Sequence, residues 1–364
     1  MSRVKGSDRM LKQFTKAERG WIMYDWANSA FSAIIAAIIL PNFYSTITKG
    51  IPQAGPWWGY ATSIATLICA LFAPIFGTLG DYRGYKKRLF TAFALLGIAA
   101  TAALSFTANW KLMLVLYIFG TIGFNGSCVF YDGFLPDVTT DNRMDTVSTY
   151  GYGLGYIGGS TIPLVMALIL ILFGESFGVS SDLACQISFM ITAVWWLVFT
   201  IPMWRHVHQV HAIEPEGNVV RQTLRRMGSV MGRIVKSRGL LLFLLAYFFY
   251  IDGVGTIIHM ATIFGQNMGL DSTALIVILM VVQLVAFPCA IAYGKLIPAD
   301  SANEFVGFFD IFGKFSAGVG PALFSLGWSA TQQVYLGIIP VLMMFVAGLV
   351  LFLCVPRDMK KISH

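Results

Sequence analysis

The chain has 364 residues, of which 57% are apolar and only 12% are charged, and its net charge is +7. Its mean hydropathy of +0.71 is above the range of soluble globular proteins, so we expect a polytopic, all-α membrane protein. A positive charge can indicate nucleic-acid binding, but here the basic residues flank apolar segments and we expect no such partner. The five cysteines stand singly in apolar segments, which argues against a disulfide framework or a zinc site.

Ten apolar segments are long enough to cross a bilayer as helices. They are residues 21–44, 57–80, 89–106, 111–135, 147–173, 184–204, 240–264, 272–296, 304–326 and 334–355. If the amino terminus lies inside, inside segments hold 22 of the 25 Lys and Arg residues, so the positive-inside rule places both termini in the cytoplasm. The first segment is too long for a signal-peptide core and is expected to be retained.

A long polar connection after the sixth segment divides the membrane helices into two groups. We predict a six-helix bundle and a four-helix bundle, with repeated proline and glycine patterns in the two halves, as in many transporters. The predicted parts are a basic cytoplasmic amino terminus (1–20), the first bundle (21–204), a cytoplasmic linker with a basic amphipathic helix (205–238), the shortened second bundle (239–355) and a cytoplasmic tail (356–364).

Four aspartates lie inside apolar segments, where an ionisable side chain is costly and is a functional candidate by default. Three of them, Asp25, Asp132 and Asp252, are predicted to couple proton movement or to bind substrate. For Asp132 and Asp252 a structural alternative stays open, in which the acid is hydrogen-bonded to backbone at a helix break beside Gly133 or Gly253. Candidates beside these carboxylates are Tyr24, Asn28, Tyr131 and, two turns beyond Asp252, His259.

The fourth aspartate, Asp310, precedes Lys314 by four residues in the ninth segment. This spacing and order suit an intrahelical ion pair, which lowers the cost of burying both charges. A structural pair and a role in gating or coupling both remain open.

The loop after the second segment reads GTLGDYRGYKKR from Gly77 to Arg88. This resembles the cytoplasmic signature of the major facilitator superfamily, although a tyrosine stands where that family usually has arginine. Gly77 and Gly84 are expected to permit close approach of helices. Asp81 is expected either to cap a neighbouring helix or to pair with an arginine, for which Arg83 is one candidate. Such a contact would hold the inward gate closed.

Residues 18–31 and 305–315 resemble the vacuole-effluxer-like group of this superfamily. The resemblance implies a twelve-helix, two-bundle fold that works by alternating access, with amino acids as cargo. In this chain Tyr293 to Leu296 runs straight into Ile297 and Pro298, where the family has a further helical hairpin. Family helices 9 and 10 are therefore expected to be missing, which leaves about ten.

These features predict a major-facilitator-type secondary transporter of a small polar metabolite in the cell membrane, with amino-acid efflux as the leading case. Protons are the expected coupling ion and membrane lipids the expected surroundings. No nucleotide-binding loop, catalytic motif or metal signature is present, so we expect neither an enzyme nor a cofactor or metal site. The alternative is a shortened, non-transporting scaffold, receptor or inactive remnant. The oligomeric state is left open.

Overall fold

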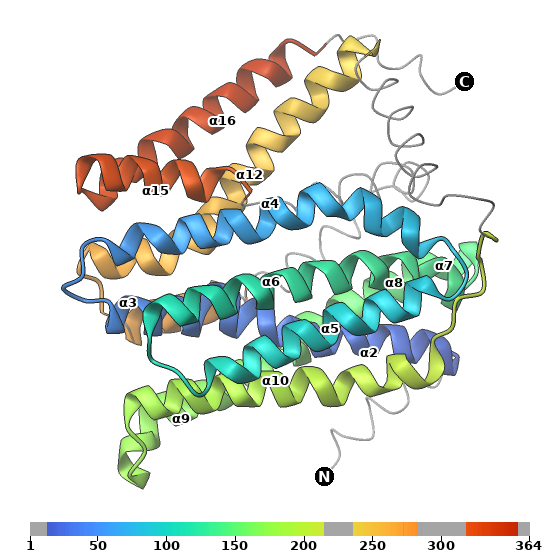
Figure 1. Cartoon of the computed structure of the whole chain (residues 1–364), viewed down its shortest axis with the longest axis horizontal. Helices are drawn as coiled ribbons and strands as arrows, with labels where there is room; N and C mark the ends of the chain where they lie inside the picture. The colour runs from blue at the N-terminus through green and yellow to red at the C-terminus, as the bar shows by residue number, and fades with distance from the viewer. Residues whose placement is uncertain (1–12, 215–235, 272, 283–284, 286–317, 356–364) are drawn as a thin grey trace.

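The computed structural model describes residues 13–214, 236–271, 273–282, 285 and 318–355 (Figure 1). Within them, eight helical segments are long and apolar enough to cross a membrane. These eight correspond to predicted segments 1 to 7 and 10. Segments 8 and 9 lie largely outside the described residues, so the count of ten remains a prediction.

The first six membrane segments pack together as one group, in which α5 lies along α6 and α10 lies along α2. Large aromatic side chains, among them Tyr24, Tyr117 and Trp196, are fully buried between them. The long elements are α2 (Lys16–Ala30), η2 (Phe31–Ile38), α3 (Ile39–Ile47), α4 (Ala54–Gly80), α5 (Tyr85–Leu104), α6 (Trp110–Gly133), α8 (Met144–Leu154), η4 (Gly155–Ser160), α9 (Thr161–Phe173) and α10 (Ser181–His206). Short turns between them are α7 (Leu135–Val138), η3 (Asp141–Arg143) and η5 (Gly174–Phe177).

The described part of the second group includes α12 (Arg238–Asn267), α15 (Gly320–Thr331), η7 (Val334–Gly337) and α16 (Ile338–Leu353). Glycines let α12 and α16 approach closely, because a β-carbon at Gly348 would lie 3.2 Å from the carbonyl oxygen of Ala246. The helix α15 begins at Gly320, inside predicted segment 9, and ends at Thr331, beyond its predicted limit at residue 326. That boundary of segment 9 was therefore wrong.

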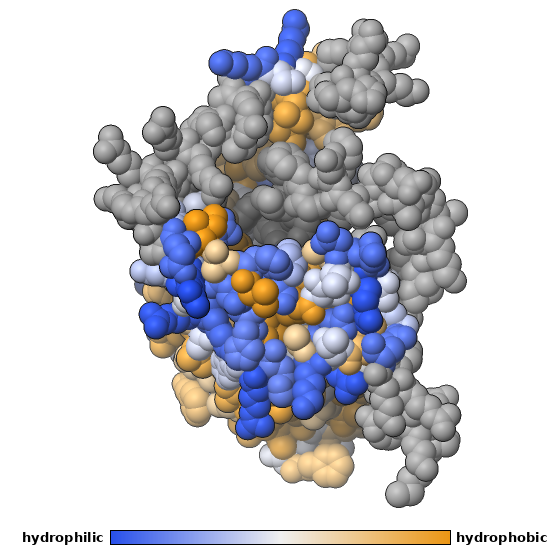
Figure 2. Space-filling view, turned by 90° about the vertical axis from the view of Figure 1, so that its right-hand side faces the viewer, coloured by the Kyte–Doolittle hydropathy of each residue, from blue (hydrophilic) through white to orange (hydrophobic). Residues whose placement is uncertain are grey.

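The two groups meet near the α3–α4 connection, which we call the outer end because the expected topology places this connection on the outside. There α15 packs on the first half of α4, and the last turns of α12 pack on η2 and α3. A β-carbon at Gly59 of α4 would lie only 2.1 Å from the Ser325 hydroxyl oxygen of α15, so glycine is required for this contact. Toward the opposite end α12 and α16 diverge from the first group (Figure 1). Figure 2 shows that this opposite end is rich in hydrophilic residues.

Two membrane segments that were predicted as continuous α-helices contain π-helical stretches. Segment 1 contains η2, which ends three residues before Pro41, and segment 5 contains η4, which ends three residues before Pro163. Proline has no backbone N–H to donate, so the regular hydrogen-bond ladder is interrupted just before it. In segment 1 the freed carbonyl is that of Ala37, and it accepts a 2.8 Å hydrogen bond from the Thr262 hydroxyl of α12. Such π-helical irregularities are frequent at functional sites.

Candidate functional site

Asp25 lies in the middle of α2, on the side that packs against the glycine-rich segment 5. Its side chain is half-buried. A β-carbon at Gly155 would lie 2.8 Å from Asp25 Oδ2 and 2.9 Å from the Ser29 hydroxyl oxygen. The missing side chain of Gly155 therefore makes the room that this carboxylate occupies. The four-residue spacing of Gly151, Gly155 and Gly159 is typical of a close helix contact, and the packing of α2 on these glycines confirms one.

An aromatic wall stands beside this carboxylate. Tyr131 of α6 stacks on Trp21 of α2, with ring centroids 4.2 Å apart, and the Trp21 indole N–H donates a 2.8 Å hydrogen bond to the Tyr131 carbonyl oxygen. Asp25 is close enough to Tyr131 and Tyr156 to interact with both electrostatically. The structure thus brings together two of the predicted residues, Asp25 and Tyr131.

Two other predicted residues are engaged inside the first bundle. The hydroxyl of Tyr24 is fully buried and donates a 2.6 Å hydrogen bond to the Ser127 hydroxyl oxygen. The amide of Asn28 is also buried and donates to the Cys128 sulfur at 3.7 Å. Both side chains link α2 to α6, so their geometry favours helix bridging over contact with a transported molecule.

Asp252 is fully buried in α12, but it faces α15. Its Oδ2 atom accepts a 2.8 Å hydrogen bond from the Gly320 backbone N–H, and both carboxylate oxygens lie within hydrogen-bond distance of the Val319 backbone nitrogen. The carboxylate therefore caps the amino terminus of α15, where the helix dipole favours an anion. This is the backbone-capping arrangement that the sequence left open as an alternative.

Asp132 is half-buried in the last turn of α6. Directly after it, the carbonyl oxygen of Gly133 accepts a 2.8 Å hydrogen bond from the Lys86 ammonium group of α5. Asp132 therefore lies close to the polar end of the bundle, whereas Asp25 and Asp252 lie deeper in their helices.

The signature loop between α4 and α5 pairs with the chain that follows α10. Arg83 forms a 2.9 Å ion pair with Glu214, and both side chains are largely exposed. Residue Asp81 ends α4, and its carbonyl oxygen accepts a hydrogen bond from the Ile213 N–H. Gly84 has a φ of 81°, a conformation that favours glycine.

The close helix approach predicted at Gly77 stays a prediction. Among the described residues no atom lies within 4 Å of where its β-carbon would stand. Asp310 and Lys314 lie outside the described residues, as does the predicted amphipathic helix of the linker.

Sequence reasoning did not single out a buried ion pair at the polar end. The Lys86 ammonium group lies 2.8 Å from Asp137 Oδ2, with side-chain exposures of 9% and 0%. Asp137 Oδ1 accepts hydrogen bonds from the backbone N–H groups of Val210 and His211. This pair ties α5 to α7 and to the chain after α10. In the sequence Lys86 is one of several loop cations, and nothing in its spacing separates it from Lys87.

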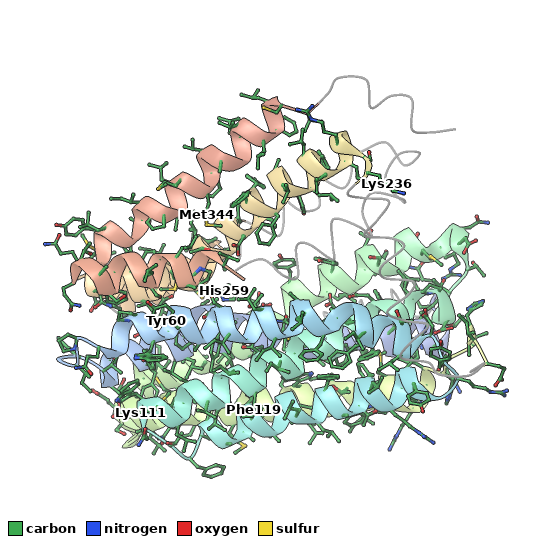
Figure 3. All side chains as sticks on the ribbon, turned by 45° about the horizontal axis from the view of Figure 1, so that its top comes forward. Tyr60, Lys111, Phe119, Lys236, His259 and Met344 are labelled. Carbon is green, nitrogen blue, oxygen red and sulfur yellow. The ribbon has the colours of Figure 1, made fainter. Side chains whose placement is uncertain are left out.

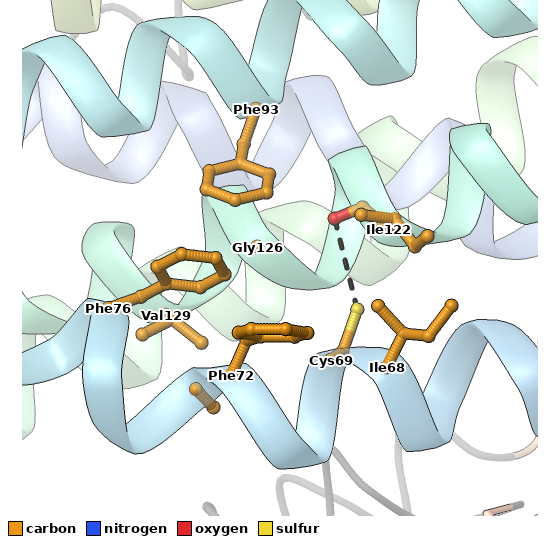
Figure 4. A pocket seen from close by; sticks show the side chains of 9 residues that line it. Ile68, Cys69, Phe72, Phe76, Phe93, Ile122, Gly126 and Val129 are labelled. Carbon is orange, nitrogen blue, oxygen red and sulfur yellow. Dashed lines mark hydrogen bonds between the residues drawn. The ribbon is translucent and has the colours of Figure 1, made fainter.

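A cavity of about 220 Å³ lies between α4, α5 and α6 (Figure 4). Its lining includes Ile68, Phe72, Phe76, Phe93 and Val129, and every lining side chain is apolar. Ile68 and Phe72 are also exposed on the bundle surface. These properties do not suit a polar cargo, so we do not assign the substrate site to this cavity.

The outer end carries its own polar contacts between the two groups. The hydroxyl groups of Tyr60 in α4 and Ser329 in α15 are 3.1 Å apart, and the Trp58 indole N–H donates to the His259 carbonyl oxygen at 3.2 Å. Figure 3 shows Tyr60 and His259 in this region. At α3 and α12, the Gln266 amide donates to Asn42 Oδ1. These contacts join α15 and α12 to the first bundle.

Two packed groups of membrane helices, each with a carboxylate inside a span, are the arrangement expected of the major facilitator fold. Solved structures agree on the fold: a point mutant of the nucleoside transporter NupG superposes with a TM-score of 0.61 at 10% identity, covering 93% of this chain and 98% of that one. Within this class, the chain belongs to the vacuole effluxer Atg22-like family, whose sequence model matches residues 57–292 and 288–363.

Two relatives illustrate the family. An MFS-type transporter of Bacillus subtilis, YxiO, is 40% identical over 96% of this chain and 97% of its own length. Autophagy-related protein 22-1 of Sclerotinia sclerotiorum is 30% identical, over 39% of this chain and 26% of its own length. The chain is thus a multi-pass membrane protein of a transporter family, as the sequence predicted.

The alignment with the Bacillus subtilis relative also bears on the expected missing hairpin. It extends over 415 positions, whereas this chain has 364 residues, so at least 51 positions of the relative have no counterpart here. The two matches to the family meet at residues 288–292, immediately before Tyr293, where the hairpin is expected to be absent. Both findings support the loss of family helices 9 and 10.

Proposed function

We propose that this protein is a secondary transporter that moves a small polar metabolite by alternating access. Amino-acid efflux is the first candidate, since the family is described as vacuole effluxers. The basic residues favour a location in the cell membrane with both termini in the cytoplasm. Protons are the proposed coupling ion.

The observation that carries this proposal is the position of Asp25. A half-buried carboxylate in the first third of a membrane helix is costly, and here Gly155 leaves it room beside an aromatic wall. A group so placed can exchange a proton or bind a substrate amine while the surrounding helices stay packed. Asp132, nearer the polar end, is proposed as a second site on the same path.

The described contacts between the two groups are those that alternating access would have to change. Contacts between the groups lie at the outer end, at Gly59 of α4 and Thr262 of α12, while α12 and α16 diverge toward the end that carries Arg83 (Figure 1). In alternating access this outer contact must open and an inner contact must form.

Counterflow in proteoliposomes tests the proposal. The reconstituted protein is loaded with a mixed amino-acid pool, and uptake of labelled amino acids is measured with and without a pH gradient. We expect exchange in the wild type and exchange that no longer responds to pH in Asp25→Asn. Asp182→Asn, which changes an exposed acid in the first turn of α10, is the matched control and should behave as wild type. Absence of exchange by folded wild-type protein counts against amino-acid transport.

The missing hairpin favours one alternative, a membrane protein that no longer transports. An insertion experiment distinguishes an active transporter from an inactive one. The corresponding hairpin of the Bacillus subtilis relative is inserted between Lys295 and Leu296. Exchange only after insertion would identify the natural chain as inactive, and exchange before insertion would exclude the alternative.

A further inference from the structure

We propose that the apolar cavity between α4, α5 and α6 binds one acyl chain of a membrane phospholipid. The site is separate from Asp25 and Asp252, and its occupation does not depend on transport. Three properties of the cavity point to this ligand: its place between the helices, its lining, and its opening on the membrane-facing surface of the bundle.

The cavity is a groove whose floor is α6 and whose walls are α4 and α5. Both α4 and α5 pack along α6, whereas they contact each other much less. A β-carbon at Gly123 of α6 would lie 2.3 Å from the Gly97 backbone nitrogen of α5, so these two helices touch backbone to backbone. On the α4 side the lining includes the large side chains of Phe72 and Phe76, and a space remains between the walls.

The lining is apolar and largely aromatic. On α4, the lining residues Ile68, Phe72 and Phe76 follow one another at four-residue spacing, so they share one helix face. On α6, the missing side chain of Gly126 leaves room for the Phe93 ring of α5, because a β-carbon there would lie 2.4 Å from this ring. Figure 4 looks into the groove, with Phe72 and Phe76 on the α4 side and Phe93 on the α5 side.

Such a lining disfavours water. A buried water needs two to four polar partners, and an engineered apolar cavity of about 150 Å³ stays dry and binds benzene. The Cys69 thiol in the lining is directed to the Ile122 carbonyl oxygen, 4.0 Å away, and is at most a weak partner for water (Figure 4). An empty groove would leave its wall atoms without van der Waals contacts on one side. A hydrocarbon chain supplies these contacts.

The groove opens on the surface of a membrane-spanning helix. The lining residues Ile68 and Phe72 are 37% and 41% exposed, and Leu71 beside them is 69% exposed. Phe72 lies eight residues before the end of α4 at Gly80, or about 12 Å along the helix, which is less than half of a hydrocarbon core of about 30 Å. At this depth the surrounding molecules are phospholipid acyl chains.

The size of the groove suits a segment of one chain. Phe76 meets Phe93 edge to face with ring centroids 5.0 Å apart, so the walls touch at this level, and it stacks on Phe72 with centroids 5.8 Å apart. The volume of about 220 Å³ exceeds that of a cavity that holds one benzene ring, about 150 Å³. A short run of methylene groups fits, while the head group and the rest of the lipid stay in the bilayer.

Photochemical labelling of the full chain in lipid nanodiscs tests the inference. The probe is a phosphatidylcholine that carries a diazirine in the middle of one acyl chain, diluted into unlabelled phosphatidylcholine. After illumination, mass spectrometry of the digested protein assigns the label to residues. A parallel sample contains a fatty acid with the same diazirine, because a free fatty acid offers the same chain without the phospholipid.

Phe72 and Phe119 provide a matched comparison in the wild type. Both are phenylalanines at the surface, 41% and 47% exposed, but Phe119 of α6 does not line the groove. We expect the phospholipid probe to label Phe72 about tenfold more than Phe119, the ratio that a difference of about 1.4 kcal/mol in binding free energy produces. Ala73→Leu adds atoms to the lining and should remove this excess. Ala99→Leu makes the same change at an exposed position of α5 outside the lining and should keep it.

Equal labelling of Phe72 and Phe119 in the wild type would overturn the inference without any variant. So would an excess that survives in folded Ala73→Leu, or labelling of Phe72 by the fatty acid but not by the phospholipid. The samples contain no amino acid, so failure of amino-acid counterflow together with the expected labelling would reject the cargo and leave the lipid site in place.

Discussion

The Thr262 hydroxyl of α12 donates a 2.8 Å hydrogen bond to the Ala37 carbonyl oxygen of η2, 225 residues earlier in the chain. Ala37 lies four residues before Pro41, which cannot donate the usual helical hydrogen bond. The carbonyl oxygen that proline leaves free in one bundle thus accepts a hydrogen bond from a side chain of the other bundle. This hydrogen bond is part of the outer contact.

Thr262→Val should therefore destabilise the protein, because it keeps the side-chain shape but leaves the half-buried Ala37 carbonyl oxygen without this donor. We expect the free energy of unfolding in mixed micelles to fall by about 1–3 kcal/mol. Thr46→Val is the matched control. The Thr46 hydroxyl donates to the Asn42 carbonyl oxygen of its own helix at 3.0 Å and is exposed, so its loss should have little effect. Equal losses in the two variants would contradict the special role of Thr262.

Gly59→Ala should open the outer contact. The new methyl group would lie 2.1 Å from the Ser325 hydroxyl oxygen, and the Pro321 backbone behind it cannot yield like a flexible side chain. A cysteine introduced by Ser325→Cys in a background without native cysteines should then react faster with a membrane-impermeant thiol reagent added from outside. Gly77→Ala, in the same helix, meets no described atom within 4 Å and should leave the rate unchanged. An unchanged rate in Gly59→Ala would show that α15 does not rest on this glycine.

The membrane segments could be predicted because the bilayer imposes a length and an apolar composition on each helix. Their ends were less predictable. Segment 1 was expected to begin at Trp21, but α2 begins at Lys16, since Thr15 and Glu18 form a capping box. The Thr15 hydroxyl accepts from the Glu18 N–H, and the Glu18 carboxylate accepts from the Thr15 N–H. This pattern is legible in the sequence, although the hydropathy of the segment does not reveal it.

For the candidate site, the sequence predicts which residue types take part but not which residues they contact. A carboxylate inside an apolar segment identifies Asp25 and Asp252 equally, whereas their partners depend on which helix each one faces. Asp25 faces the glycines of segment 5, and Asp252 faces the start of α15. Gly320 and Pro321 are a helix-start signal, but nothing in the sequence shows that Asp252 faces it, so the capping of α15 could be anticipated only as an alternative.

Gly155→Ala should impair transport while leaving the fold intact. Its methyl group would lie 2.8 Å from Asp25 Oδ2, so the carboxylate must turn away from its place beside Tyr131. We expect counterflow to lose most of its response to the pH gradient, with a thermal midpoint close to that of the wild type. Gly153→Ala, two residues earlier, meets nothing within 4 Å among the described atoms and serves as the control. If both variants transport alike, the room at Gly155 has no part in the cycle.

Lys86→Met should cost far more stability than the loss of any exposed ion pair in the same loop. It leaves Asp137, whose side chain is fully buried, without Lys86 and with the His211 imidazole 3.2 Å away, and removal of one member of a buried pair typically costs about 3–5 kcal/mol. The backbone N–H groups of Val210 and His211 remain as donors, so the lower part of that range is expected.

Arg83→Gln provides the comparison, because the side chains of Arg83 and Glu214 are 76% and 70% exposed and such pairs contribute about 0–1 kcal/mol. Unfolding of the two variants in the same micelles measures the difference. A second variant, Asp137→Asn, tests the same pair from the other side and should be destabilised as well, since it replaces the negatively charged partner of the buried Lys86 ammonium group with a neutral amide. Losses as small as that of Arg83→Gln would mean that water reaches the pair and screens it, and that the chain after α10 is held by its backbone contacts alone.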